Sequence, residues 1–235
     1  DDAEAVRWYR LAAKQGDARA QFNLGNMYSE GRGVPQDYAA AVKWYRKAAE
    51  QGFAAAQNNL GIMYSQGQGV PQDDAAAVKW YRKAAAQGLA TAQHNLGSMY
   101  SEGRGVPEDN AEAVRWYRKA AEQGFAAAQF NLGLKYHNGY GVPQDDAEAV
   151  RWYRLAAKQG NAAAQNNLGA MYDNGEGVLK DYATAHMWFN IAAANGVENA
   201  AENRDAAESR MTAADISKAQ RRARVCMESG YQECD

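Results

Sequence analysis

The chain reads DARAQFNLGNMYSEGRGVPQDYAAAVKWYRKAAEQG at residues 17–52, and the same pattern begins again every 36 residues. The spacing is clearest in the tryptophans, which recur without slippage at Trp8, Trp44, Trp80, Trp116, Trp152 and Trp188. A period of roughly 20 to 50 residues is typical of solenoids, propellers and other repeat arrays. The local structure of one unit therefore decides which of these architectures the chain forms.

One unit has the pattern of two helices joined by a tight turn. Apolar residues from Ala20 to Tyr28 recur at i, i+4, i+7 and i+8, which predicts an amphipathic helix, here called helix A. Two glycines and Pro35 end this helix, because proline cannot continue it and pushes the preceding residue to an extended conformation. Asp37 is the expected N-cap of a second helix, helix B, and Gly52 the expected left-handed residue after its end.

Helix pairs repeated in this way predict a single all-α stack in which each repeat contacts its neighbours. Full repeats are expected at residues 17–52, 53–88, 89–124, 125–160 and 161–196. Residues 1–16 match helix B alone, so the chain is expected to begin inside a longer array and to leave a helical face exposed there. After residue 196 the pattern fails, and residues 197–235 are expected to form two capping helices, at about 198–210 and 212–227, and a tail.

The charge and hydropathy of the chain exclude some classes of binding partner. The 26 basic and 28 acidic residues give a net charge of −2, which argues against a nucleic-acid partner. No apolar run approaches the roughly 18 residues of a membrane span, so no membrane insertion is expected. The chain starts with aspartate rather than methionine, and any signal peptide is expected to have been removed already.

The repeated string A-x-A-Q-x-N-L-G-x-M-Y-x-x-G-x-G-V-P-x-D-x-A-x-A-V-x-W-Y-x-x-A-A-x-Q-G resembles the Sel-one-like repeat (SLR), a relative of the tetratricopeptide repeat. The resemblance covers residues 1 to about 196 and involves helix, turn and packing residues together. It implies an all-α, right-handed α-solenoid, or superhelix, of antiparallel helix pairs. It also implies an adaptor or binding scaffold, often in bacterial proteins that meet other proteins, host proteins included. In such stacks the helix A faces line a concave groove.

The positions that differ between repeats indicate where a ligand would bind, since packed positions are constrained by the repeat. The divergent positions of helix A lie at i, i+4 and i+7, on one face. They include Phe22, Asn58, His94, Phe130 and Asn166, then Asn26, Ile62, Ser98 and Leu134, then His137. We predict that this column lines the groove and binds a protein or peptide. Its two phenylalanines are expected to be exposed, which is costly without a purpose.

An asparagine follows the first of these positions in every repeat: Asn23, Asn59, Asn95, Asn131 and Asn167. Tetratricopeptide grooves use a matching asparagine to hold an extended peptide backbone, and an amide side chain has the donors and the acceptor for this task. The alternative is that each amide bonds to a neighbouring helix or loop, which fits five identical residues better than ligand binding does. Both interpretations stay open at this point.

Catalysis has little support. The three histidines, His94, His137 and His186, fall in different repeats without metal-ligand spacing, and each is expected in the groove or on the surface. We therefore expect no enzyme activity, no cofactor and no metal. Two alternatives are a structural assembly factor that acts through its ends and a hydrolase hosted in the groove. The latter would need a clustered set of histidines or carboxylates.

The chain has two cysteines, Cys226 and Cys234, both in the tail. Their spacing lets the segment that contains Gly230 fold back, so we predict a disulfide that pins the tail. A disulfide favours the periplasm or the extracellular space, whereas two free thiols would favour the cytoplasm. The expected molecule is therefore a secreted or periplasmic protein-binding scaffold, most simply a monomer.

Overall fold

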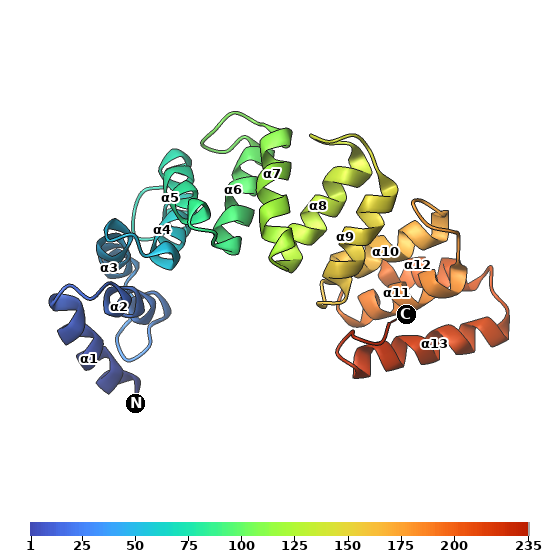
Figure 1. The fold of residues 1–235 in the computed structure, drawn as a ribbon. Helices are drawn as coiled ribbons and strands as arrows, with labels where there is room; N and C mark the ends of the chain where they lie inside the picture. The colour runs from blue at the N-terminus through green and yellow to red at the C-terminus, as the bar shows by residue number, and fades with distance from the viewer. Residues whose placement is uncertain (235) are drawn as a thin grey trace. The chain divides into compact units, whose positions relative to one another are not determined.

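The computed structural model describes residues 1–234, and the regular secondary structure of that range consists of thirteen α-helices (Figure 1). The helix A segments are α2 (Ala18–Glu30), α4 (Ala54–Gln66), α6 (Ala90–Glu102), α8 (Ala126–Asn138) and α10 (Ala162–Asn174). The helix B segments are α1 (Asp2–Lys14), α3 (Tyr38–Glu50), α5 (Asp74–Ala86), α7 (Asn110–Glu122), α9 (Asp146–Ala157) and α11 (Tyr182–Ala194). Two tail helices follow, α12 (Ala200–Glu208) and α13 (Ala213–Glu228). The prediction of an all-α solenoid of antiparallel helix pairs is confirmed.

The chain divides into two compact units, Asp1–Trp116 and Tyr117–Asp235, and the boundary lies within α7. Within the first unit, α2 packs on α3 and α4 packs on α5. Within the second, α8 packs on α9 and α10 on α11. Each unit is thus built from the same helix pair.

The ends of the helices follow the predicted turn chemistry. Helix α2 ends at Gly31, whose φ of 70° is left-handed and suits glycine, because a side chain there would be strained. The Asp37 carboxylate accepts a hydrogen bond from the amide of Ala40 at 2.9 Å and so caps α3. Gly52, with a φ of 89°, follows the end of that helix. The sequence therefore determines where each helix of a pair begins and ends.

The helix pairs are held together by a leucine and by a close approach of an aromatic ring to a glycine, with a tyrosine ring from α3, α5 and α9 and a phenylalanine ring from α11. The leucine of helix A is fully buried in every repeat, as Leu60 is in α4. The next residue, Gly61, lies directly under the ring of Tyr81 in α5, and a methyl group at Gly61 would come within 2.6 Å of that ring. The Leu-Gly dipeptide is therefore a packing requirement, since only glycine leaves room for the ring.

The tail helices pack on the last repeat (Figure 1). Both α12 and α13 contact α11, and Cys226 of α13 joins a buried cluster with Trp188 and Ile191. A disulfide links Cys226 and Cys234, with their Cα atoms 4.5 Å apart. The Thr212 hydroxyl caps α13 by accepting from the amide of Asp215 at 3.2 Å, as predicted. Helix α12 is shorter than expected, and its N-cap Asn199 makes no side-chain capping bond.

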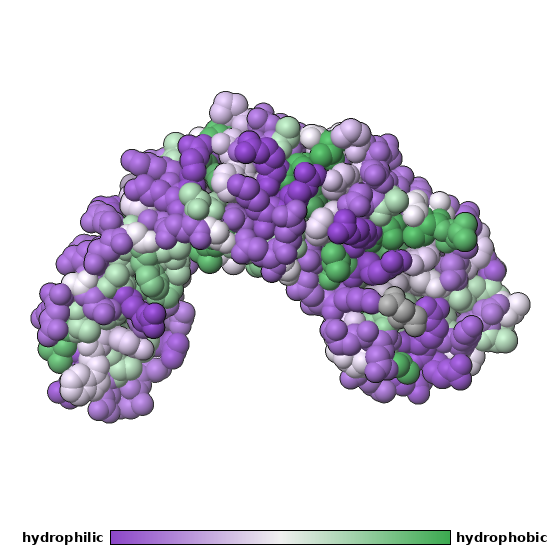
Figure 2. Space-filling model, viewed as in Figure 1, coloured by the Kyte–Doolittle hydropathy of each residue, from purple (hydrophilic) through white to green (hydrophobic). Residues whose placement is uncertain are grey.

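The first helix leaves an apolar face uncovered, as predicted. Trp8 is 65 % exposed and Leu11 is 54 % exposed, whereas Trp188 is buried. Elsewhere the visible face is mostly hydrophilic, with hydrophobic residues in small separate patches (Figure 2). Among residues 1–234, no helix is both long and apolar enough to cross a membrane.

Candidate functional site

The predicted groove residues lie together along the helix A segments of each unit, and none is fully exposed. Asn58 is buried, and the others are half-buried: Phe22, Asn23, Asn26, Asn59, Ile62, His94, Asn95, Ser98, Phe130, Asn131, Leu134, His137, Asn166 and Asn167. A half-buried column can form the floor of a binding surface, because each side chain is positioned by its neighbours and still reaches solvent.

The expectation of two exposed phenylalanines is wrong. The ring of Phe22 lies 5.1 Å from the ring of Phe53 and 5.9 Å from that of Tyr45, and Phe22 packs against the core of α3 and α4. Phe130 lies 6.0 Å from the ring of Tyr153 in the second unit. Aromatic pairs at these separations are mutually stabilising. Both phenylalanines therefore contribute to packing between helices, and their burial needs no ligand to explain it.

Several asparagine amides join neighbouring helices. The Asn95 side chain donates to the Asn58 carbonyl oxygen at 3.1 Å, and Asn59 donates to Asn26 at 3.4 Å. In the second unit, Asn203 of α12 donates to Asn166 at 3.2 Å. These bonds favour the interpretation that the amides link adjacent repeats. The side chains of Asn95 and Asn167 also line cavities.

Two small cavities occupy the same position of the repeat, one in each unit. The cavity of the first unit, about 280 Å³, is lined by Ile62, Ser65, Gln66, Tyr81, Asn95, Ser98, Met99 and Arg104. The cavity of the second unit, about 250 Å³, is lined by His137, Tyr153, Asn167, Ala170, Met171, Asn174 and Glu176. Six of these lining positions correspond, two repeats apart. Each cavity lies between two helix A segments and is closed below by the tyrosine of the helix B between them.

The two cavities differ in charge. In the first unit, the Arg104 guanidinium lines the cavity and pairs with Asp74 at 2.8 Å and with the Ser65 hydroxyl at 3.0 Å. In the second unit, a carboxylate, Glu176, takes the place of Arg104. Ser65 is replaced there by His137, whose Nδ1 lies 2.8 Å from Asp146.

The tyrosine under each cavity keeps its proton. Burial raises the pKa of Tyr81 and of Tyr153 to about 12, because the charged phenolate is disfavoured away from water. The Asn167 side chain lies close enough to the Tyr153 hydroxyl to act against this rise in pKa. By hydrogen-bond geometry the Tyr153 hydroxyl has no partner among the described residues, and the residue is only 1 % exposed. A buried hydroxyl without a partner is uncommon and requires an explanation.

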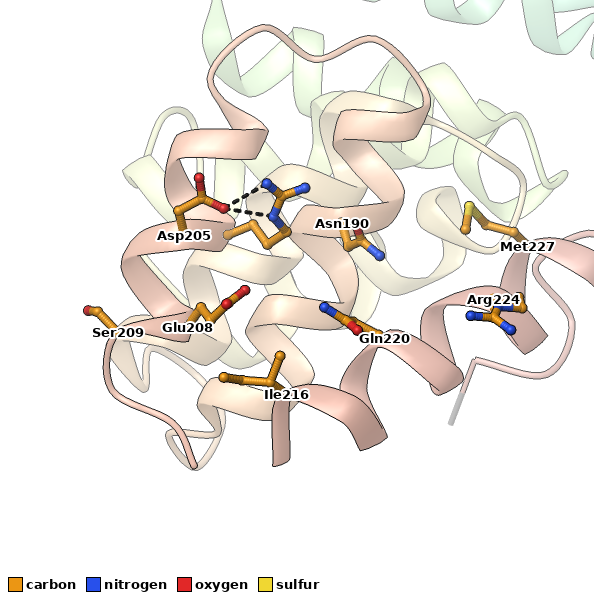
Figure 3. A pocket seen from close by; sticks show the side chains of 9 residues that line it. Asn190, Asp205, Glu208, Ser209, Ile216, Gln220, Arg224 and Met227 are labelled. Atoms are coloured by element: carbon orange, nitrogen blue, oxygen red, sulfur yellow. Dashed lines mark hydrogen bonds and ion pairs between the residues drawn. The ribbon is translucent and has the colours of Figure 1, made fainter. Parts of the chain in front are cut away.

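A third, larger cleft lies in the tail, between α11, α12 and α13 (Figure 3). It measures about 850 Å³ and is lined by Asn190, Arg204, Asp205, Glu208, Ser209, Ile216, Gln220, Arg224 and Met227. Arg204 and Asp205 form an ion pair at 2.6 Å on its wall. This cleft could not be predicted from the sequence, because the tail has no repeat pattern from which helix positions could be assigned.

His186 is neither in a groove nor on the surface, so that expectation is wrong. It is fully buried in α11, and its Nε2 lies 3.1 Å from a carboxylate oxygen of Glu208 in α12. The equivalent position in the preceding repeat is Val150, a core residue. The change from valine to histidine was the available sequence signal, since only a polar partner from the tail makes a histidine acceptable there.

The other histidines lie apart from it. Burial lowers the pKa of the His94 imidazole, which therefore favours the neutral form. Residues 1–234 contain no cluster of three or more histidine, cysteine, aspartate or glutamate side chains placed to hold a metal ion.

The sequence matches the family model described as the Sel1 repeat at residues 1–17, 18–53, 54–89, 90–125, 126–161 and 162–197. Comparison with curated proteins found no match. Among solved structures, the chain is similar to a Sel1 repeat protein from Oxalobacter formigenes, with 38% identity, coverage of 84% of each chain and a TM-score of 0.76.

Two further structures share the fold. A putative Sel1 repeat protein from Klebsiella pneumoniae subsp. pneumoniae is 26% identical, covering 86% of this chain and 99% of that one, with a TM-score of 0.55. An immunity protein from Pseudomonas aeruginosa is 22% identical, covering 81% and 73%, with a TM-score of 0.51. The six matched repeats, which extend from residue 1 to residue 197, show that this chain belongs to the Sel1 repeat family.

Proposed function

We propose that this protein is a non-catalytic scaffold that binds a protein or peptide along its helix A face. The observation that carries the proposal is the pair of equivalent cavities, one in each unit, at the same position of the repeat. Packing alone explains why the lining tyrosine, asparagine and methionine recur. It does not explain why the other three corresponding residues differ in charge or size between the two cavities, as expected of a surface that contacts different parts of a ligand.

The disulfide supports a setting outside the cytoplasm. The bond between Cys226 and Cys234 is stable in oxidising compartments, whereas cytoplasmic thiols are kept reduced. We infer a periplasmic or extracellular protein, and a partner that is exposed in the same compartment.

The proposal is tested by selecting peptides from a displayed random library against the purified chain. Two variants fill the cavities with an indole: Ile62→Trp in the first unit and Ala170→Trp in the second. Selected peptides should bind at least one of them about ten-fold more weakly, a loss of about 1.4 kcal/mol, because the cavity is occupied. Fluorescence anisotropy measures the affinities.

Matched controls place the same indole on exposed positions of helix B that line none of these cavities, Lys79→Trp and Ala86→Trp, and circular dichroism checks that all four variants are folded. These controls should bind the selected peptides as the wild type does. The proposal fails if no peptide is enriched, or if the cavity variants and the controls bind equally well.

A further inference from the structure

The turn residue between the two glycines that follow helix A, Glu176 in the last repeat, distinguishes the cavity of the second unit from the equivalent positions of other repeats. In two other repeats this position is an arginine that pairs with the aspartate at the start of the preceding helix B. Arg32 pairs with Asp2 at 3.2 Å, and Arg104 pairs with Asp74 at 2.8 Å. The residue at this position in the last repeat is Glu176, and the corresponding aspartate is Asp146. The cation is therefore replaced by a second carboxylate.

The backbone holds Glu176 where Arg104 stands in the first unit. The glycine after each of these residues packs directly on the backbone of the corresponding aspartate. A methyl group at Gly105 would overlap the carbonyl oxygen of Asp74, and one at Gly177 would overlap that of Asp146. The two turns consequently approach helix B in the same way, so the backbone places residues 104 and 176 at equivalent positions relative to the aspartate of helix B.

The hydroxyl of Tyr153 is a second indication, after the carboxylate at position 176, that the cavity accommodates a group from outside the chain. At the same position in the first unit, the Tyr45 hydroxyl donates to the Asn26 carbonyl oxygen at 2.7 Å. The residue equivalent to Asn26 is Leu134 in the repeat of Tyr153, and leucine cannot accept a hydrogen bond. Tyr153 thus lines the cavity with a buried hydroxyl that has no partner among the described residues. Leaving such a group unpaired costs on the order of 1–3 kcal/mol.

Other tyrosine hydroxyls of this chain accept hydrogen bonds from guanidinium groups. In five repeats a guanidinium donates to the hydroxyl oxygen of a tyrosine, at distances between 2.6 and 2.9 Å. The pairs are Arg10–Tyr28, Arg46–Tyr64, Arg82–Tyr100, Arg118–Tyr136 and Arg154–Tyr172. Arg104, meanwhile, shows a guanidinium paired with the helix B aspartate at the cavity itself.

We propose that the cavity of the second unit binds the side chain of an arginine presented by a protein or peptide partner, an inference that rests on the proposed scaffold function. The guanidinium takes the place that Arg104 fills in the first unit, between Asp146 and Glu176. Its N–H groups donate to these carboxylates and to the Tyr153 oxygen. The volume of about 250 Å³ suits one side chain rather than a folded element.

Charge and geometry select arginine over other residues. Asp146 and Glu176 carry two negative charges, and His137, at 2.8 Å from Asp146, offsets at most one of them. The site is therefore anionic whether or not the histidine is protonated. A planar guanidinium can bond to two carboxylates and a hydroxyl at once, whereas the ammonium of lysine acts as a compact point charge.

The probe is N-acetyl-L-arginine amide, titrated into the ¹⁵N-labelled full chain and followed by the backbone amides of Asn167, Glu176 and Gly177. We expect saturable shifts at these amides, with a Kd on the order of millimolar for so small a ligand. The citrulline analogue has the same shape without the charge and should bind at least about ten-fold more weakly. The lysine analogue should fall between the two.

Glu176→Arg is the decisive variant, because it introduces the internal guanidinium that Arg32 and Arg104 provide in two other repeats, and it should abolish binding of the arginine probe. Tyr153→Phe should weaken binding about three- to ten-fold, through loss of one hydrogen bond. Glu122→Arg makes the same change of charge at an exposed position in the last turn of α7, where a basic residue is favourable, and should bind as the wild type does.

Three results would overturn the proposal: equal binding of the arginine and citrulline probes, unchanged binding by Glu176→Arg, or saturable shifts that avoid these amides. The experiments also distinguish failure of the arginine site from failure of the proposed scaffold function. Selected peptides that are blocked by Ile62→Trp or Ala170→Trp but tolerate replacement of every arginine would reject the arginine site and support the scaffold. Arginine binding without any enriched peptide would reject the scaffold.

Discussion

Two tyrosines that occupy the same place in helix B differ in one hydrogen bond. The Tyr45 hydroxyl donates to Asn26, whereas the Tyr153 hydroxyl has no partner among the described residues. Two positions of helix A near this hydroxyl differ between the repeats: Leu134 stands where the first repeat has Asn26, and His137 stands where it has Ser29. These residue differences can be read from the sequence. Their effect on the tyrosine hydroxyl is known only from the structure, which shows that the helix A and helix B positions face each other.

This pair yields a prediction for stability. Tyr45→Phe should lower the free energy of unfolding by about 0.5–1.5 kcal/mol, because a hydrogen bond is lost and Asn26 keeps only the weaker of its two donors, Asn59. Tyr153→Phe should leave stability unchanged or raise it by up to about 1 kcal/mol, because it removes an unsatisfied group, and Phe189 already fills the equivalent position of the last repeat. Urea unfolding followed by circular dichroism measures both. A larger loss for Tyr153→Phe than for Tyr45→Phe would contradict this account.

Helices α1 and α9 show how neighbours determine the role of an element. Residues 1–16 and 145–160 are identical in sequence, and both form helix B. Yet Trp8 is 65 % exposed and Trp152 is 6 % exposed. Tryptophans between them pack on the preceding repeat, as Trp80 does on the cluster of α3 and α4. Local sequence therefore specifies the helix, while its position in the array specifies which face is buried.

Identical helices provide a controlled test of this effect. Trp152→Ala should destabilise the protein by about 3–5 kcal/mol, since a buried indole leaves a cavity. Trp8→Ala should cost less than about 1 kcal/mol, because that indole is mostly in water already. Both losses are measured by chemical denaturation with fluorescence and circular dichroism. Similar values for the two variants would show that the indole contributes through its own helix rather than through the neighbouring repeat.

Across the whole molecule, stability is expected to be local, because each repeat contacts only its neighbours. The disulfide between Cys226 and Cys234 lies at one end, in a buried cluster with Trp188 and Ile191 of α11. Closing so short a loop contributes about 2.5 kcal/mol through the entropy of the unfolded chain. Reduction should therefore loosen α11 and the tail helices and leave α2 to α4 unaffected.

Amide hydrogen exchange with and without reductant tests this locality. Protection should fall in α11, α12 and α13 after reduction and stay the same in α2 to α4. The double variant Cys226→Ala/Cys234→Ala serves as the control, since its exchange should not respond to reductant. Uniform loss of protection along the chain on reduction would mean that the array unfolds as one cooperative unit, against the expectation of local stability.

The amino-acid sequence by itself determined the repeat, the helix boundaries, their caps and the residues of the predicted helix A column. These features depend on interactions within about one unit, and Asp37, Gly31 and Leu24 have the same local surroundings in most repeats. The cysteine pair was also predictable, because its two members are close in the chain.

Only the tertiary structure decided what each of these side chains does. It buried His186 against Glu208, packed Phe22 against the core of α3 and α4, and left the Tyr153 hydroxyl without a hydrogen-bond partner in a cavity that Glu176 also lines. Each outcome depends on a residue from another helix, and a repeat pattern does not show which departures from it compensate one another. Burial, charge and hydrogen bonding are properties of neighbours in space, so the arginine site could be inferred only once those neighbours were known.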